Sequence, residues 1–230
     1  PPPTWGRSEV KLGMIFTSRD EEDLEQRFLA WHRAQGVDLF LSTQVYGPER
    51  QSQGMTELQL LAHSERCDWV LDSDADEFWW SGRGTVKEVL ERLPAGLAWA
   101  LAQVTEFTPG GGRALAGHRN WMGLRLSPKV CHRPGPGIRV LRGNGGVLGA
   151  HGRGRTLPDL EVLHWPLRSP GQARRKCQDQ LAWEGRDPRP ARRLRGYRDL
   201  ERDPEAVFGR IARLPSRPDD RLQRALGRVA

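Results

Sequence analysis

The stretch DWVLDSDADEFWW, residues 68–80, decides the fold because an apolar strand in it runs directly into a group of acidic residues. The acidic residues are Asp72, Asp74, Asp76 and Glu77. Side chains alternate along a strand, so the three aspartates are expected to project from one face. Carboxylates held that close repel one another, and a hard divalent cation such as Mg²⁺ or Mn²⁺ offsets the repulsion. The stretch therefore predicts a cation site at the carboxyl end of a strand, with a solvated acidic turn as the alternative.

The residues before this stretch predict an alternation of strands and helices. Leu24, Phe28 and Trp31 fall at the i, i+4, i+7 spacing that gives a helix one apolar face, and Asp20 is expected to cap that helix. The expected strands span residues 10–17, 37–41 and 69–71, and the expected helices span residues 20–35 and 55–65. This order predicts an α/β fold with a mostly parallel sheet flanked by helices. In such sheets ligands bind beyond the carboxyl ends of the strands, where the acidic residues are expected.

The chain after residue 84 predicts a less regular, antiparallel second half. A helix is expected from Thr85 to residue 93, because Thr is a good capping residue. Gly and Pro are frequent between residues 110 and 155, which indicates loops and short strands. The expected elements are strands over residues 99–107, 121–126, 138–141 and 160–164, and a helix over residues 170–183. We expect one domain over residues 1–185. Residues 186–230 are expected to pack on it as an Arg- and Pro-rich connector (186–198) and two short helices (204–214 and 218–229).

The composition places the chain among globular proteins with a basic surface. Its 230 residues carry a formal net charge of +7, and the sequence pI is about 10.0. Only four of the 36 basic residues are lysines, and the arginines are scattered among Gly, Ala and Pro. We interpret this charge as a solvated arginine-rich surface and expect no nucleic-acid partner. A non-catalytic, arginine-rich binding module for nucleic acid or protein is the alternative, supported by the charge and by residues 186–198.

The cysteines and the hydropathy bear on the compartment. Cys67, Cys131 and Cys177 include no CxxC pair, so neither a disulfide framework nor a zinc site is expected. No apolar run approaches the roughly 18 residues that identify a membrane-spanning helix. We therefore expect a protein of the reducing cytoplasm without a transmembrane segment.

Two known kinds of acidic site fit residues 68–80 poorly. A calcium-binding EF-hand loop beginning at Asp72 needs Gly at its sixth position and Glu at its twelfth, but those positions hold Glu77 and Arg83. A phosphatase that resembles the haloacid dehalogenases would use Asp72 as the nucleophile of a DxDx(T/V) motif. The chain has the two aspartates but lacks the Thr or Val that ends this motif. The phosphatase stays open as an alternative.

The acidic stretch and blocks on both sides of it resemble one family of enzymes. Residues 69–80, WVLDSDADEFWW, are similar to the segment that carries the DxD motif, here within DADEF, in family-2-like glycosyltransferases, which have the GT-A fold. The other similar blocks are DEE at 20–22, WHRAQGVD at 31–38, SPKV at 127–130, HRP at 132–134, and LHWPLRS at 163–169 followed by Lys176. The resemblance covers about residues 10–185, and the set of blocks in this order is specific.

This resemblance implies a metal-dependent glycosyltransferase, an inverting enzyme that moves a sugar from a nucleotide-sugar donor to an acceptor. The implied cofactor is Mn²⁺ or Mg²⁺, which stabilises the leaving nucleoside diphosphate. The acceptor is a glycan, a lipid-linked sugar or a small molecule. The implied metal ligands are Asp74, Asp76 and His164. The implied donor-binding residues are Asp72, Asp74, Arg19, Lys129, Arg168 and Lys176.

An inverting transferase also needs a general base that deprotonates the acceptor hydroxyl. Glu77 and Glu106 are the favoured candidates, because Glu77 adjoins the metal motif and Glu106 ends a strand expected to point to the same edge. Asp159 and Glu161 stay open as alternatives. Trp79 and Trp80 are candidates for an apolar platform under a sugar ring, and at least one of them is expected to pack in the core instead.

The chain departs from the family pattern in two places. Residues 42–47, STQVYG, lack the Asp of the stretch that contacts the nucleoside in the family, which leaves the identity of the donor open. Residues 143–146, GNGG, hold Gly where related sequences often have His. The second departure points to an altered acceptor site or to reduced activity.

Overall fold

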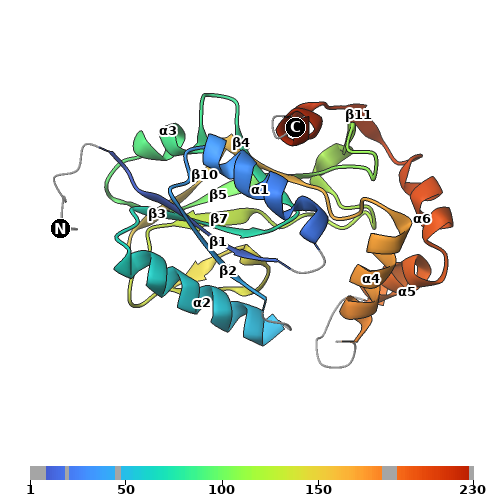
Figure 1. Ribbon diagram of the computed structural model, residues 1–230, viewed down its shortest axis with the longest axis horizontal. Coiled ribbons are helices and arrows are strands. Elements are labelled where there is room, and N and C mark those ends of the chain that lie inside the picture. Colours follow the sequence, from blue (N-terminus) through green and yellow to red (C-terminus); the bar gives the residue numbers. More distant parts are fainter. Residues whose placement is uncertain (1–8, 19–20, 45–47, 183–190, 228–230) are drawn as a thin grey trace.

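A computed structural model describes residues 9–18, 21–44, 48–182 and 191–227 of the protein. In this part of the chain a curled seven-stranded sheet lies between helices (Figure 1). The helices are α1 (Glu22–Ala34), α2 (Pro48–Ser64), α3 (Val86–Glu91), α4 (Pro170–Leu181), α5 (Ala191–Arg202), α6 (Pro204–Ile211) and α7 (Arg221–Gly227). The main sheet consists, in spatial order, of β2 (Leu39–Thr43), β1 (Leu12–Thr17), β3 (Trp69–Asp74), β7 (Lys129–His132), β5 (Leu97–Glu106), β10 (Arg153–His164) and β4 (Glu77–Ser81).

The sheet is mostly parallel in the direction of its strands. β2, β1 and β3 are parallel neighbours, and so are β5 and β10. β7 runs antiparallel to both β3 and β5, and β4 runs antiparallel to β10. Five strands therefore end at the same edge of the sheet, and the predicted α/β fold with a mostly parallel sheet flanked by helices is confirmed.

Helices cover both faces of the sheet because the strands are apolar on both sides. Along β1, Met14 packs in the core cluster that includes Phe28 of α1, whereas Ile15 packs in a second cluster with Met55 of α2. Figure 1 shows α1 and α3 on one face and α2 on the other. A strand with both faces buried is typical of the parallel part of an α/β sheet.

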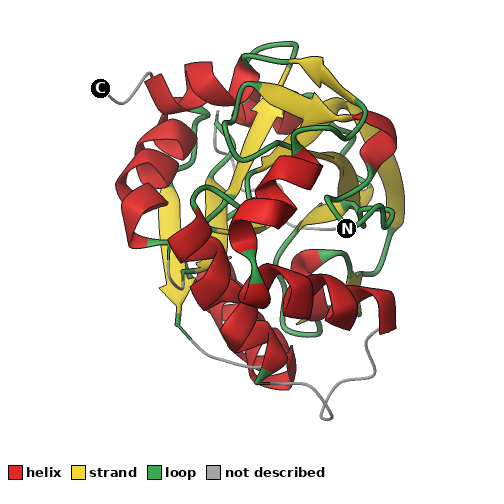
Figure 2. Cartoon of the chain, turned by 90° about the vertical axis from the view of Figure 1, so that its right-hand side faces the viewer, coloured by secondary structure: helices red, strands yellow, loops and turns green. Residues whose placement is uncertain are grey.

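The C-terminal helices gather at the end of the sheet where the parallel strands finish. Helices α4, α5 and α6 share an apolar cluster that contains Cys177, Leu200 and Ile211. The three helices lie next to one another in Figure 1, and Figure 2 shows several helices on the side of the molecule that faces the viewer. β11 (Ser216–Pro218) pairs with β6 (Arg113–Leu115), and α7 contacts α1. These contacts hold residues 191–227 against the sheet domain. The remaining pair of short strands is β8 (Arg139–Val140) with β9 (Val147–Leu148).

Several local predictions differ from the structure. α2 begins at Pro48 rather than at residue 55, because proline is well accommodated in the first turn of a helix. Residues 191–198, predicted as part of a connector, form the first turns of α5, which buries Gly196 and Leu200. Residues 121–126 form turns instead of a strand, with a single bridge between positions 119 and 125. Glu21 occupies the N-cap position of α1, and the predicted N-cap residue Asp20 lies outside the described residues.

Two further observations concern membrane-spanning helices and the cysteines. Within the described ranges, no helix combines the length and the apolar composition that crossing a membrane requires. Cys67, Cys131 and Cys177 are buried and free, each in the interior of a packed layer.

Candidate functional site

The acidic residues meet at the carboxyl edge of the sheet because strands that are distant in sequence are neighbours there. β3 ends at Asp74, a two-residue turn contains Asp76, and β4 begins at Glu77. β4 does not pair with β3 but with β10, so that Glu77 lies opposite His164. On its other side, His164 lies opposite Glu106 of β5. The sheet register therefore places one histidine between carboxylates from two neighbouring strands.

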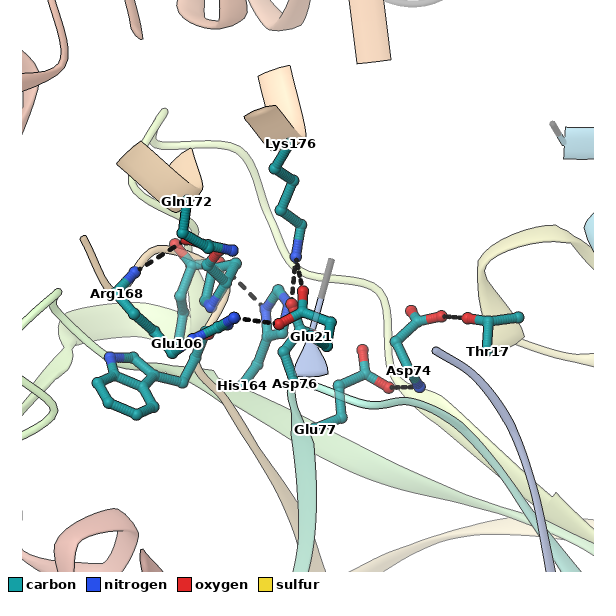
Figure 3. A network of polar contacts seen from close by, with 12 residues as sticks. Thr17, Glu21, Asp74, Asp76, Glu77, Glu106, His164, Arg168, Gln172 and Lys176 are labelled. Atoms are coloured by element: carbon teal, nitrogen blue, oxygen red, sulfur yellow. Dashed lines mark hydrogen bonds and ion pairs between the residues drawn. The ribbon is translucent and has the colours of Figure 1, made fainter. Parts of the chain in front are cut away.

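Asp76 is almost completely buried at the centre of this group (Figure 3). Its carboxylate accepts a short hydrogen bond from Nζ of Lys176, on α4, and its Oδ2 lies 3.7 Å from Nε2 of His164. Its backbone carbonyl accepts a hydrogen bond from the N–H of Trp165 at 2.9 Å. Burial alone would raise the pKa of Asp76, but the charges of Lys176 and His164 hold this pKa well below its usual value. Asp76 is therefore an ionised carboxylate in a buried position.

Glu106 lies next to the second ring nitrogen of His164. Nδ1 of His164 lies 3.3 Å from Oε2 of Glu106, and Oε1 of Glu106 accepts a hydrogen bond from the backbone N–H of Trp121 at 2.6 Å. Burial would lower the pKa of His164, but Asp76 and Glu106 raise it to about 10. A carboxylate on one ring nitrogen of a histidine orients the other nitrogen, and this arrangement is common behind metal-binding histidines.

Glu77 forms the second buried ion pair of the site. Its Oε1 lies 2.6 Å from Nζ of Lys129, and its Oε2 accepts a hydrogen bond from the backbone N–H of Asp74 at 3.0 Å. Burial raises the pKa of Glu77 to about 7, against the lowering effect of Lys129. Burial would lower the pKa of Lys129, but Glu77 and Asp74 raise it. This carboxyl group can exchange a proton near neutral pH.

Asp74 stands apart from Asp76 on the side of the site nearest to β1. Its Oδ1 accepts hydrogen bonds from Thr17 at 2.5 Å, from Gln51 at 3.2 Å and from Asn144 at 3.3 Å. Its Oδ2 lies 3.2 Å from Nζ of Lys129. Four side chains from separate segments thus fix the Asp74 carboxylate, which stays about one third exposed.

Glu21 is a part of the site that the sequence reasoning did not single out. Its side chain is buried, and its carboxylate forms a short ion pair with Arg168. Oε1 of Glu21 lies 3.2 Å from Nζ of Lys176. Burial raises its pKa to about 7, against the lowering effect of Lys176, and Asp76 adds to the increase. The acidic block at residues 20–22 was the available signal, because a carboxylate just before the first helix lies beside the carboxyl end of β1.

The structure places the other predicted donor-binding residues differently from one another. A cavity lies at this edge of the sheet, and Lys129 and Lys176 line it. Arg168 does not line it, because its guanidinium forms ion pairs with Glu21 and, at 2.8 Å, with Asp23. Arg168 contacts the site through its ion pair with Glu21. Arg19 lies outside the described residues.

Asp72 is completely buried below the cavity and does not line it. Its Oδ1 lies 3.2 Å from Nε2 of His132, on β7, and burial raises the pKa of Asp72 despite the opposing effect of His132. The side chain of Asp72 therefore faces a neighbouring strand inside the protein, and its contact with the donor stays a prediction.

The alternative base candidates and the aromatic platform also lie away from the cavity. Asp159 pairs with Arg83 at 3.0 Å, and Glu161 pairs with Arg221, whose guanidinium lies over the ring of Trp80. Trp79 is completely buried, and neither it nor Trp80 lines the cavity. The predicted sugar platform is therefore not formed by these rings.

A cavity of about 850 Å³ opens above the acidic residues. This volume falls in the usual range of small-molecule sites. Six carboxylic residues line it: Glu21, Asp74, Asp76, Glu77, Glu106 and Asp179. Basic side chains line it as well: Arg125, Lys129, His164, Lys176 and Arg193. The site therefore combines a strongly acidic floor with separate basic groups.

The floor of this cavity has the donor atoms that a divalent cation requires. One ligand atom each from Asp76, Glu77 and His164 lies within 4.8 Å of the other two. The two carboxylates suit hard cations such as Mn²⁺ and Mg²⁺, which complete their coordination with water and substrate phosphates. Nζ of Lys176 forms an ion pair with the Asp76 carboxylate, and a metal ion bound there would balance the same negative charge. Asp74, the other predicted ligand, is not among these three residues.

Comparison with models of known protein families gives no match for this chain, and comparison with curated protein sequences gives none either.

We predict that His164→Ala lowers the affinity of the protein for Mn²⁺ by at least about tenfold, because one donor atom is lost. Glu106→Gln should lower the affinity in the same direction, since loss of a carboxylate behind a ligand typically costs about 10- to 100-fold. Isothermal titration with Mn²⁺ measures both effects. His63→Ala, at an exposed position on α2, is the matched control and should leave the affinity unchanged. Equal Mn²⁺ affinities of the wild type and all three variants would show that His164 is not a metal ligand.

We also predict that Mn²⁺ binds more tightly as the pH rises from 6 to 8. In the metal-free protein the pKa of His164 is about 10, so its ring carries a proton throughout this range. A metal ligand must be deprotonated, and each proton released on binding makes the affinity rise by up to about tenfold per pH unit. Titrations at several pH values measure this slope, and His164→Ala should reduce it. An affinity that falls with pH would contradict the prediction.

Proposed function

We propose that the protein is a metal-dependent glycosyltransferase that moves a sugar from a nucleotide-sugar donor to an acceptor hydroxyl. The observation that carries the proposal is the pairing of Asp76 with His164 and Lys176 at the floor of the cavity. A buried aspartate with a histidine behind it suits a divalent cation, and two lysines beside it suit a diphosphate. The resemblance of residues 69–80 to the DxD segment of GT-A glycosyltransferases supports the same assignment.

The cation is Mn²⁺ or Mg²⁺, and Asp76 and His164 are its proposed protein ligands. When bound, the ion supplies Lewis-acid stabilisation of the negative charge that grows on the leaving diphosphate. Lys176 neutralises Asp76 in the metal-free protein and is free to turn to a phosphate oxygen once another cation satisfies that carboxylate. Lys129 offers a second positive charge from the opposite side of the floor.

The donor is proposed to lie at the end of the cavity lined by Thr17, Gln51 and Asp74. Asp74 is held there by fixed hydrogen bonds, so its carboxylate is preorganised to accept hydrogen bonds from donor hydroxyl groups. This role differs from direct metal ligation, and it agrees with the absence of Asp74 from the described group formed by Asp76, Glu77 and His164.

Glu77 is the proposed general base. Its pKa of about 7 lies near neutral pH, which is favourable for proton transfer, and it lines the cavity. In the reaction, the acceptor oxygen forms a bond to the anomeric carbon as the bond from this carbon to the diphosphate breaks. The hydroxyl proton passes to Glu77, and the diphosphate leaves with the electron pair. Glu106 instead acts through His164, whose ring it orients.

The alternatives fit the site less well. A phosphatase would need Asp72 as an accessible nucleophile, but this side chain is buried against His132. A nucleic-acid module would need a basic surface free of competing carboxylates, whereas six carboxylic residues line this cavity. Three free, buried cysteines suit a reducing compartment, and we propose that the protein acts in the cytoplasm.

We predict that the protein binds UDP or GDP in a manner that depends on Mn²⁺ or Mg²⁺, and that Asp76→Asn lowers this affinity by at least about tenfold. The amide keeps the size of the side chain but removes the charge that holds the cation. Isothermal titration with each nucleotide, with and without metal, measures the effect. Asp159→Asn, outside the cavity, is the matched control and should bind like the wild type. Absence of nucleotide binding under every metal condition would overturn the proposal.

We predict that Glu77→Gln lowers the rate of nucleotide-sugar hydrolysis by about 10²- to 10⁴-fold, the usual contribution of a general base. Water serves as the acceptor in this assay, and release of UDP or GDP measures the rate. Nucleotide affinity should change far less than the rate. Glu57→Gln, at an exposed position on α2, is the control. A Glu77→Gln variant that hydrolyses the donor at the wild-type rate would exclude Glu77 as the base.

A further inference from the structure

The end of the cavity away from Asp74 has a wall of aromatic and basic side chains that the proposed donor chemistry does not use. Trp121, in the turn before β7, and Tyr197, on α5, both line the cavity, and their ring centroids lie 6.4 Å apart. Met122 adds an apolar surface beside Trp121. Flat, apolar rings of this kind pack well against the face of a sugar or another ring.

Arg193 adds a positive charge to the same wall. It lies four residues before Tyr197 on α5, so both side chains project from one face of the helix into the cavity. Its Nε is buried and has no hydrogen-bond acceptor among the described residues. A buried guanidinium N–H without an acceptor carries a desolvation cost, and the positive charge of a side chain that lines the cavity attracts an anionic group. Arg125, in the turn that precedes β7, lines the cavity as a second cation.

This wall is firmly attached to the floor of the site. A Cβ at Gly196 would come within 2.6 Å of the sulfur of Met122, so a side chain at this position would require Met122 to shift. On the other side of the turn, the backbone N–H of Trp121 is hydrogen-bonded to Glu106, which contacts His164. The rings are thus placed at a fixed position beside the proposed metal ligands.

We propose that the Trp121, Tyr197 and Arg193 wall is the acceptor subsite, and that the acceptor is a ring-containing compound with an anionic group, a carboxylate or a phosphate. This inference rests on the proposed transferase function, and it specifies the class of acceptor. The aromatic rings hold the ring of the acceptor, and Arg193 pairs with its anionic group through a fork of N–H donors. Asp179 also lines the cavity and has an interaction of its own.

Three p-nitrophenyl compounds that share one ring and differ in charge test the subsite. They are p-nitrophenyl phosphate, p-nitrophenyl β-D-glucuronide and the neutral p-nitrophenyl β-D-glucoside. Isothermal titration of the full chain without nucleotide should give at least tenfold tighter binding of one anionic compound than of the glucoside. The preferred compound distinguishes a phosphate from a carboxylate as the anionic group.

The matched variants are Arg193→Gln and Arg195→Gln, two exchanges on the same helix that remove the same charge. Arg195 is exposed and does not line the cavity. Arg193→Gln should reduce the preference for the anionic compound at least tenfold, whereas Arg195→Gln should keep it, and thermal unfolding establishes that both variants are folded. Equal binding of charged and neutral compounds, no binding of any of them, or a preference that survives in Arg193→Gln would each overturn the subsite.

The two proposals fail in different ways. A wild-type protein that binds UDP or GDP with Mn²⁺ but shows no preference for an anionic compound would overturn the subsite and keep the transferase function. A preference that depends on Arg193 in a protein that binds no nucleotide would overturn the transferase function and keep an anion-binding subsite.

Discussion

The structure depends on the neutralisation of buried carboxylates at one edge of the sheet. Glu21, Asp76 and Glu77 are each almost completely inaccessible to solvent, and an isolated buried charge would be strongly unfavourable. Lys129 and Lys176 provide the opposing charges in the metal-free protein. Replacing such an arrangement by apolar residues often stabilises a protein, so its presence indicates a role other than stability. A cation and a diphosphate that bind between these charges would supply that role.

Lys176 connects this charge balance to the C-terminal third of the chain. It lies on α4, whose buried residue Cys177 packs with Leu200 of α5 and Ile211 of α6. The helices that follow the sheet domain therefore pack on α4, the same helix whose Lys176 balances the negative charge of Asp76. One face of α5 in turn presents Arg193 and Tyr197 to the cavity. Floor and wall thus form one site, in which donor chemistry and acceptor selection would occur side by side.

The sequence allowed the parallel strands and the acidic run after the third strand to be predicted, because both are local patterns. The apolar runs before Asp74 and the helical spacing of Leu24, Phe28 and Trp31 were sufficient for the strands and α1. Strand periodicity was misleading beyond Asp74, because the chain turns there and Asp76 leaves the strand, while Asp72 stays inside against His132. A contact such as that between Asp72 and His132 joins residues far apart in the chain, and no local sequence pattern predicts it. The helix at residues 191–202 was missed for the same reason, since its Arg-rich sequence is ordered by packing on α4.

The central claim is that a divalent cation occupies the position where Lys176 now balances Asp76. Anomalous diffraction at the manganese edge, from crystals of the full chain soaked with Mn²⁺ and UDP, tests it most directly. The account predicts a manganese peak roughly 2.0–2.3 Å from a carboxylate oxygen of Asp76 and from Nε2 of His164, with Nζ of Lys176 moved towards the diphosphate. A manganese peak elsewhere, or none while Lys176 remains on Asp76, would contradict it.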